Sequence, residues 1–157
     1  MDRDFKHSIY QELLTVVEED LEGVESVLAM AHDEATHSES RAEGKYDTRA
    51  TEASYLARGQ AERAGALRRD LVWLQTRLRV QGQDDAWLIQ LVGAGHKRWI
   101  LVAPVCGGRT VVHLEQTVVV VTPQSPLGSE LGDVEPGDEV ELRRGERVIS
   151  MMVERVL

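Results

Sequence analysis

The residues best suited to chemistry in this sequence are carboxylates gathered in one polar stretch. Glu39, Glu43 and Asp47 lie close together, and Glu52 follows shortly after them. Carboxylate oxygens are ligands that Mg²⁺ prefers, and a bound metal ion can activate a water molecule. Three basic residues lie among these acids and would offset their charge: Arg41, Lys45 and Arg49. The stretch is therefore either a metal site, with Mg²⁺ held at Glu43 and Asp47, or a solvated turn.

Other reactive residue types are sparse. Cys106 is the single cysteine, which excludes an intramolecular disulfide framework and a cysteine-based zinc cluster. Because only Arg109 lies near it as a base, we expect a packed thiol rather than a nucleophile. His32 and His37 are five residues apart, off the i,i+4 spacing that places two metal ligands on one helix face. We expect both histidines on a helix surface, and we expect no tightly bound cofactor.

Composition narrows the classes of function. The chain has 157 residues, with 18 Lys and Arg against 27 Asp and Glu, a net charge of −9. This acidity argues against free binding to duplex DNA, and an aromatic content of 4% argues against a base-stacking platform. No apolar run is long enough for a membrane helix, and the N-terminus lacks a signal-peptide pattern. We therefore expect a cytoplasmic protein with no membrane contact.

The elements that must position these residues divide the chain in two. Residues 1–81 contain no proline, and their apolar residues recur every three or four positions, which predicts two long helices. A polar stretch near residues 38–48 interrupts the pattern and predicts the tip of an antiparallel hairpin. Residues 1–34 hold ten acids and two bases, whereas residues 46–81 hold four acids and seven bases. Opposite charges on the two helices favour their pairing.

From residue 82 the pattern changes to short β-branched segments separated by glycine and proline. Six such segments predict five or six strands, largely antiparallel, with one short helix at SPLGSELG. The VVVV run within them predicts a strand that is buried on both faces. The expected fold class is α+β, with a helical hairpin over 1–81 and a compact sheet domain over 82–157.

The stretch VVTPQSPLGSELGDVEPGDEVEL resembles the C-terminal domain of the bacterial Gre transcript-cleavage factors. That family carries an S-P-(L/I)-G element, a short helix ending in L-G, and a G-D before the final strand pair. The residues that carry the resemblance are Ser125, Pro126, Leu127, Gly128, Leu131, Gly132, Gly137 and Asp138. The long helical hairpin before them agrees with the family, so the resemblance covers essentially the whole chain.

The resemblance implies an N-terminal coiled-coil hairpin and an FKBP-like C-terminal domain. It also implies a partner, bacterial RNA polymerase, bound through residues Ser125 to Gly128 together with Gly137 and Asp138. The hairpin would then enter the secondary channel of the polymerase. From local residue types, Ser125 and Pro126 fit either a turn offered to a partner or the N-cap and first position of the short helix. In the turn, Gly128 would allow a positive φ.

The tip departs from the family pattern. Gre factors bring two tip carboxylates to the polymerase, where they help to hold a Mg²⁺ ion that activates water. Aligning the family motif D-L-x-E-N-A-E-Y on Tyr55 places these two acids at Thr48 and Thr51. Asp47 and Glu52 are each one residue away, and one residue rotates a helical side chain by about 100°. Glu39, Glu43, Asp47 and Glu52 therefore remain candidates for a rebuilt site with Mg²⁺ shared with the polymerase.

Two other functions are open. A peptidyl-prolyl isomerase would need a pocket lined by several aromatic residues, and residues 82–157 offer only Trp87 and Trp99. A coiled-coil adaptor would instead bury four leucines of the second helix against a second copy: Leu67, Leu71, Leu74 and Leu78. A hairpin already buries them, which favours a monomer.

We therefore expect a non-enzymatic Gre-like regulator of transcription with weak or no stimulation of cleavage. Its mixed charges could also reach nascent RNA or nucleotides in the channel. The alternative is a full cleavage factor that uses the rearranged tip acids.

Overall fold

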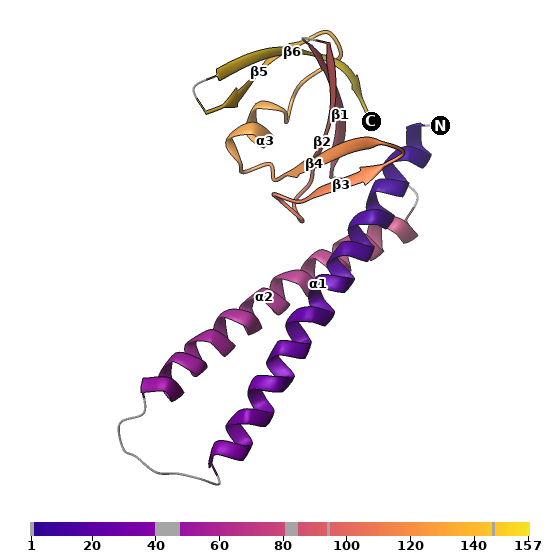
Figure 1. Ribbon diagram of the computed structural model, residues 1–157. Helices are drawn as coiled ribbons and strands as arrows, with labels where there is room; N and C mark the ends of the chain where they lie inside the picture. Colours follow the sequence, from indigo (N-terminus) through magenta and orange to yellow (C-terminus); the bar gives the residue numbers. More distant parts are fainter. Residues whose placement is uncertain (1, 40–47, 81–84, 94, 146) are drawn as a thin grey trace. The chain divides into compact units, whose positions relative to one another are not determined.

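The computed structural model describes residues 2–39, 48–80, 85–93, 95–145 and 147–157, and confirms the α+β class. The chain forms two compact units (Figure 1). One consists of Met1–Leu14 together with Trp73–Leu157, and the other of Thr15–Val72. The first turns of the N-terminal helix and the last turns of the second helix thus belong with the sheet, although they are far apart in sequence.

Two helices make the hairpin that the apolar spacing predicts. Helix α1 spans Asp2–Glu39 and helix α2 spans Thr48–Arg79. The expected tip at 38–48 lies largely outside the described residues. Two ion pairs join the helices, Asp20 with Arg63 at 4.0 Å and Glu25 with Arg68 at 2.5 Å. They connect the acid-rich helix to the base-rich one as the charge pattern predicts, although exposed pairs of this kind contribute only about 1 kcal/mol or less.

A stripe of apolar residues is buried along each helix. On α1 it contains Ile9, Leu13, Val17 and Val24, whose spacing of four and seven keeps them on one face. On α2 the buried residues include Ala64, Leu67 and Leu74. Closer to the tip the stripe is weaker, since Ala57 is only half-buried and Ala61 is exposed. The two helices are therefore less tightly packed at Ala57 and Ala61 than nearer the sheet.

The second half of the chain forms one six-stranded sheet with the strand order β3-β4-β2-β1-β6-β5. All neighbours are antiparallel except β2 and β4, which run parallel. A short helix, α3, spans Pro126–Glu130. The strands are β1 Trp87–Gly93, β2 His96–Val102, β3 Thr110–His113, β4 Gln116–Val121, β5 Glu139–Arg144 and β6 Arg147–Val156.

The core of the sheet lies between its central strands, α3 and the β5–β6 hairpin. Leu131, which ends α3, packs in this core at 1% exposure. The other fully buried members come from the central strands and the hairpin: Ile89, Leu91, Ile100, Val102, Val140, Met151 and Val153. The core explains why these segments are rich in β-branched and aliphatic residues.

The prediction that the VVVV run is buried on both faces is wrong. Val118 and Val120 are fully buried, whereas Val119 is 37% exposed. Successive side chains of a strand point to opposite faces, and only one face of β4 is completely covered. The other face, which carries Val119, borders a cavity described below.

The start of α1 packs with the sheet through aromatic residues. The ring centroid of Phe5 lies 4.9 Å from that of Trp99 and 5.8 Å from that of His113. Lys6 donates hydrogen bonds to the carbonyl oxygens of Ala86 and Leu157, at 2.7 and 3.2 Å. At the other helix, Tyr10 meets Trp73 edge to face at 5.6 Å. Trp73 and Trp99 are thus packing residues.

Within the described ranges, no helix combines the length and the apolar character that a membrane crossing requires.

Candidate functional site

The S-P-L-G element begins helix α3 with a complete N-terminal cap. Ser125 is extended (φ −71°, ψ 153°), and its hydroxyl accepts a hydrogen bond from the amide of Gly128 at 3.0 Å. The same hydroxyl donates to the carbonyl oxygen of Thr122 at 2.8 Å. Pro126 occupies the first turn, where its missing N–H costs nothing. The side chain of Ser125 is therefore engaged within the loop, whereas Pro126 is exposed and Leu127 is half-buried against the core of the sheet.

Gly128 does not need a positive φ, which corrects the expectation from sequence. It lies within α3 and is absent from the described residues with positive φ. A Cβ atom built on it would lie 1.9 Å from the carbonyl oxygen of Thr122. Glycine is required here because the backbone of α3 passes directly against the end of β4.

Gly137 and Asp138 form a second turn before β5. Gly137 has φ 103°, the positive φ that a type II turn requires at its third position. Pro136 comes before it, at the second position, where proline is common. The Asp138 carboxylate accepts a hydrogen bond from the amide of Glu135 at 2.9 Å, and the Asp138 amide donates to the carbonyl of Glu135 at 3.1 Å. The Gly137 amide and the Asp138 carbonyl both bond to Val153 at 2.8 Å. This pair aligns β5 with β6, a structural role that sequence alone did not reveal.

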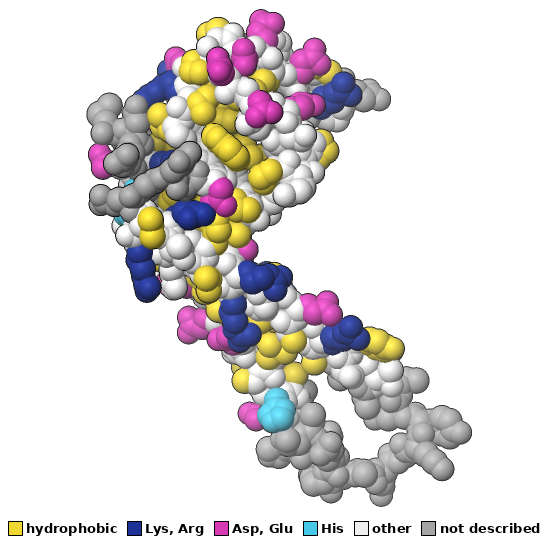
Figure 2. All heavy atoms as spheres, turned by 180° about the vertical axis from the view of Figure 1, so that it is seen from behind, with side chains coloured by type: hydrophobic (Ala, Val, Ile, Leu, Met, Phe, Trp, Pro, Cys, Tyr) yellow, Lys and Arg dark blue, Asp and Glu magenta, His cyan; other side chains and the backbone are white. Residues whose placement is uncertain are grey.

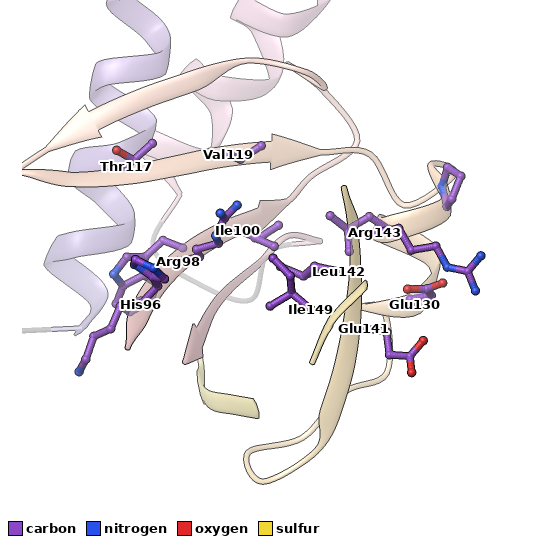
Figure 3. Close-up of a pocket in the computed structure, with 14 residues that line it drawn as sticks. His96, Arg98, Ile100, Thr117, Val119, Glu130, Glu141, Leu142, Arg143 and Ile149 are labelled. Atoms are coloured by element: carbon purple, nitrogen blue, oxygen red, sulfur yellow. The ribbon is translucent and has the colours of Figure 1, made fainter. Parts of the chain in front are cut away.

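A cavity of about 870 Å³ lies beside α3 (Figure 3). Its apolar lining comes from five elements: Ile100 of β2, Val119 of β4, Pro126 and Leu127 of α3, Leu142 of β5 and Ile149 of β6. In Figure 3 the side chains of Ile100, Leu142 and Ile149 lie close together at the centre. This size and lining are typical of a site that binds an apolar group.

Basic and acidic residues border the apolar centre of this cavity. His96, Lys97 and Arg98 come from the start of β2, Glu130 from α3, and Glu141 and Arg143 from β5. Figure 3 shows His96 and Arg98 on one side of the apolar centre, and Glu130, Glu141 and Arg143 on the opposite side, so acids and a base lie together there. Lys97 is paired with Glu154 at 3.4 Å. The cavity therefore suits an apolar segment with polar or charged ends.

The structure brings only part of the predicted site together. Pro126 and Leu127 line the cavity, whereas Ser125 and Gly128 hold the loop behind them, and the turn at Gly137 and Asp138 does not line it. Sequence reasoning missed the strand residues, chiefly Ile100, Val119, Leu142 and Ile149. The alternation within each strand marks them as facing one side, but only the pairing of strands shows that they face one another.

Most of the acidic residues predicted at the hairpin tip lie outside the residues that the structure describes. Glu43 and Asp47 lie outside the described residues, and Glu39 is the last residue of α1 with a side chain that is not described. Thr51 and Glu52 are exposed residues of α2, and Thr48 is its first residue. Among the residues that the structure does describe, no group of three His, Cys, Asp or Glu could hold a metal ion.

The cysteine and the histidine of the sequence analysis that the structure describes, Cys106 and His32, are buried and exposed, respectively, as predicted. Cys106 is a buried thiol that forms no disulfide, with φ 60° in the turn after β2. His32 is exposed on α1, and the side chain of His37 lies outside the described residues. Trp87 is 37% exposed at the start of β1. None of these positions forms a reactive cluster among the described residues.

Comparisons with known proteins found a distant structural likeness. No protein-family model matches the chain, and no curated protein matches it. The crystal structure of GreA factor homolog 1 (Gfh1) of Thermus thermophilus is 13% identical with a TM-score of 0.36, covering 96% of this chain and 94% of that chain. Thermus aquaticus Gfh1 is 16% identical with a TM-score of 0.35, at coverages of 90% and 92%. A further structure of the transcription factor Gfh1 is 14% identical with a TM-score of 0.35, at coverages of 96% and 92%.

Proposed function

We propose that this chain is a Gre-like regulator of transcription elongation that binds bacterial RNA polymerase. Its sheet unit binds the polymerase surface, and its hairpin enters the secondary channel. It stimulates transcript cleavage weakly or not at all, and acts by occupying the channel rather than as an enzyme. Any Mg²⁺ is shared with the polymerase rather than held by the free protein.

The observation that carries the proposal is the position of Pro126 and Leu127. The residues that resemble the Gre motif place these two side chains on the wall of the apolar cavity beside α3. Ser125 and Gly128 fix that wall through the cap and through contact with Thr122. A segment of the polymerase with apolar side chains would fill the cavity. Its polar flanks would meet Arg98 on one side, and Glu130, Glu141 and Arg143 on the other.

Weak cleavage is proposed because the acids of the tip do not fall on the positions that the family uses. Thr51 is an exposed residue of α2, and its neighbour Glu52 points about 100° away from it on the same helix. A carboxylate aimed in a different direction would not bind a metal ion held by fixed polymerase ligands.

The proposal is tested by binding of the full chain to purified bacterial core RNA polymerase, followed by a cleavage assay on a backtracked elongation complex. We expect measurable binding and little release of short 3′ RNA fragments, even with excess Mg²⁺. Val119→Gln should weaken binding because Val119 borders the cavity. Met152→Gln, at a similarly exposed position of β6 that does not line the cavity, is the matched control.

The alternative, a full cleavage factor, gives a different result in the same assay. Rapid fragment release that is abolished by the double change Glu43→Ala and Asp47→Ala, with binding intact, would establish the rearranged tip acids as a metal site. Absence of both binding and cleavage would overturn the proposal and favour the adaptor.

A further inference from the structure

A second cavity, of about 540 Å³, lies between the start of α1 and the sheet. All the residues that line it belong to the unit formed by Met1–Leu14 and Trp73–Leu157. Phe5 of α1 lines it from the helix, and Gln90 of β1 lines it from the sheet. A cavity of this size is typical of a site for a small molecule.

The feature that marks this cavity as a site is the buried amide of Gln90. Gln90 is 7% exposed and is the only buried polar residue among those that the structure describes. Within the described ranges its side-chain amide has no hydrogen-bond partner. Buried polar groups in proteins are almost always hydrogen-bonded, because an unpaired group has lost its bonds to water without replacement. An unpaired amide that lines a cavity therefore indicates a ligand that supplies the missing partners.

Strand pairing places Gln90 between two side chains that can contact a flat ligand. Gln90 lies directly opposite Trp99 of β2 and Arg155 of β6, and both of these residues line the cavity. The guanidinium carbon of Arg155 is 6.0 Å from the centre of the Trp99 ring. Because β1 lies between β2 and β6, the Arg155 side chain must extend over Gln90 to come this close to Trp99. A guanidinium plane and an aromatic ring thus lie beside the amide.

Ring side chains also gather at this cavity. Phe5 is the single phenylalanine of the chain, and its ring centroid lies 4.9 Å from that of Trp99 and 5.8 Å from that of His113. All three residues line the cavity. Aromatic rings and guanidinium planes are the surfaces on which unpaired bases stack. The low aromatic content of the chain excludes an extended base-stacking platform, but three rings at one place suffice for a single base.

The charges around the cavity favour an uncharged ligand. The bases Lys97 and Arg155 line it together with the acid Asp4, and Lys97 is paired with Glu154 at 3.4 Å. Figure 2 shows acidic side chains over much of the sheet unit on the face that it draws, and the whole chain has a net charge of −9. A run of phosphates would be repelled by this surface, so a nucleoside fits better than RNA.

We infer that this cavity binds the adenine ring of a nucleoside such as adenosine, and that Gln90 recognises it. The glutamine amide offers a donor beside an acceptor, which matches the N7 acceptor and the N6 donor of adenine. Inosine presents two acceptors at the same positions, so it satisfies the donor of Gln90 and leaves the acceptor unpaired. The inference goes beyond the proposed function and does not depend on binding to polymerase.

The test is titration of the purified full chain with adenosine and with inosine, followed by NMR. A ligand of this size in an open cavity should bind with a Kd of about 0.1 mM. Adenosine should bind about tenfold more tightly than inosine, a discrimination typical of a two-bond amide contact. Gln90→Met keeps the length of the side chain and removes both polar groups, so it should weaken adenosine binding about tenfold. Gln124→Met is the control, because Gln124 is an exposed glutamine of the sheet unit that lines neither cavity.

Urea unfolding separates binding from folding. Without ligand, Gln90→Met should be at least as stable as the wild type, because it removes an amide that has no partner among the described residues. A variant that is this stable and has lost adenosine binding supports the inference. The comparison of adenosine with inosine needs only the wild type, so it holds even where the variant is less stable.

Three results would overturn the inference: no binding of adenosine by the wild type, equal binding of adenosine and inosine, or unchanged binding by Gln90→Met. Tighter binding of a short adenylate RNA than of adenosine would overturn the choice of a nucleoside as the ligand. None of these results bears on the proposed function, which is tested by binding to polymerase.

Discussion

Gly128 and Thr122 are in a backbone contact that no other residue type permits. A Cβ atom at Gly128 would lie 1.9 Å from the carbonyl oxygen of Thr122 and 2.7 Å from its carbonyl carbon. Both atoms belong to the backbone, so neither can move aside without displacing the end of β4 or the start of α3. The wall of the cavity beside α3 therefore depends on this glycine.

Gly128→Ala should destabilise the protein by about 2–3 kcal/mol, the range typical of overpacking against a fixed neighbour. Gly132→Ala is the matched control from the same motif, because its Cβ would lie at an ordinary 3.7 Å from Gly128 and Ser129. Urea unfolding of both variants measures the difference. Equal stability of the two would contradict the contact described here.

The turn between β3 and β4 is strained in the native state. Leu114 and Glu115 have φ values of 47° and 62°, as a two-residue type I′ hairpin requires, and neither residue type favours that region. The double change Leu114→Asn and Glu115→Gly should raise the unfolding free energy by about 1 kcal/mol. Leu114→Ala removes the exposed side chain and keeps the strain, so chemical denaturation of this control should show no gain.

The helices and strands could be predicted because their signals are local. The spacing of Ile9, Leu13, Val17 and Val24 identifies a buried helix face without any knowledge of its partner. Likewise Ser125 and Pro126 mark the start of α3 by their types alone. Such signals depend only on residues that are close to one another along the chain.

Pairings between distant segments could not be predicted in this way. The parallel pairing of β2 with β4 places Ile100 beside Val119, and the fold of β5 and β6 brings Leu142 and Ile149 to the same cavity. Nothing in the composition of these strands specifies their order in the sheet. For the same reason the exposure of Val119, in a run of four valines, became evident only from the sheet.

Asp85 should make stability depend on pH in the acid range. Burial tends to raise the pKa of its carboxyl, but hydrogen bonds from Arg77 and from the backbone outweigh burial, so the pKa lies below its ordinary value of 3.8. A lowered pKa in the folded state stabilises the protein above the unfolded-state pKa. The contribution is lost as the pH falls through the folded-state value.

The check compares wild type and Asp85→Asn by urea unfolding between neutral pH and pH 2.5. Because the Asp85 side chain is 57% exposed, the difference at neutral pH should be at most about 1 kcal/mol. It should shrink as the pH falls below the ordinary carboxyl pKa of 3.8 and through the lower folded-state pKa. A difference that persists at the lowest pH would mean that Asp85 acts through something other than its charge.

The tip offers the most direct test of the proposal that cleavage is weak. If the acids fail only because they fall on the wrong positions, Thr48→Asp together with Thr51→Glu should restore them to the positions that the Gre motif uses. Thr48 is the first residue of α2, and Thr51 is an exposed residue of its first turn. Acids at these two positions would therefore both project from the N-terminal end of α2. An acid in the first helical turn is also favourable for the helix dipole.

We expect this double variant to bind polymerase like the wild type and to release short 3′ RNA fragments from a backtracked complex, in proportion to Mg²⁺. Thr51→Gln with Thr48→Asn is the control, since it matches the shape of the acids and cannot supply their charge. Release by the acidic variant alone would show that the position of the carboxylates limits cleavage. No release by either variant, with binding intact, would mean that the path of the tip itself, and not the residue types at 48 and 51, prevents the carboxylates from reaching the metal ion.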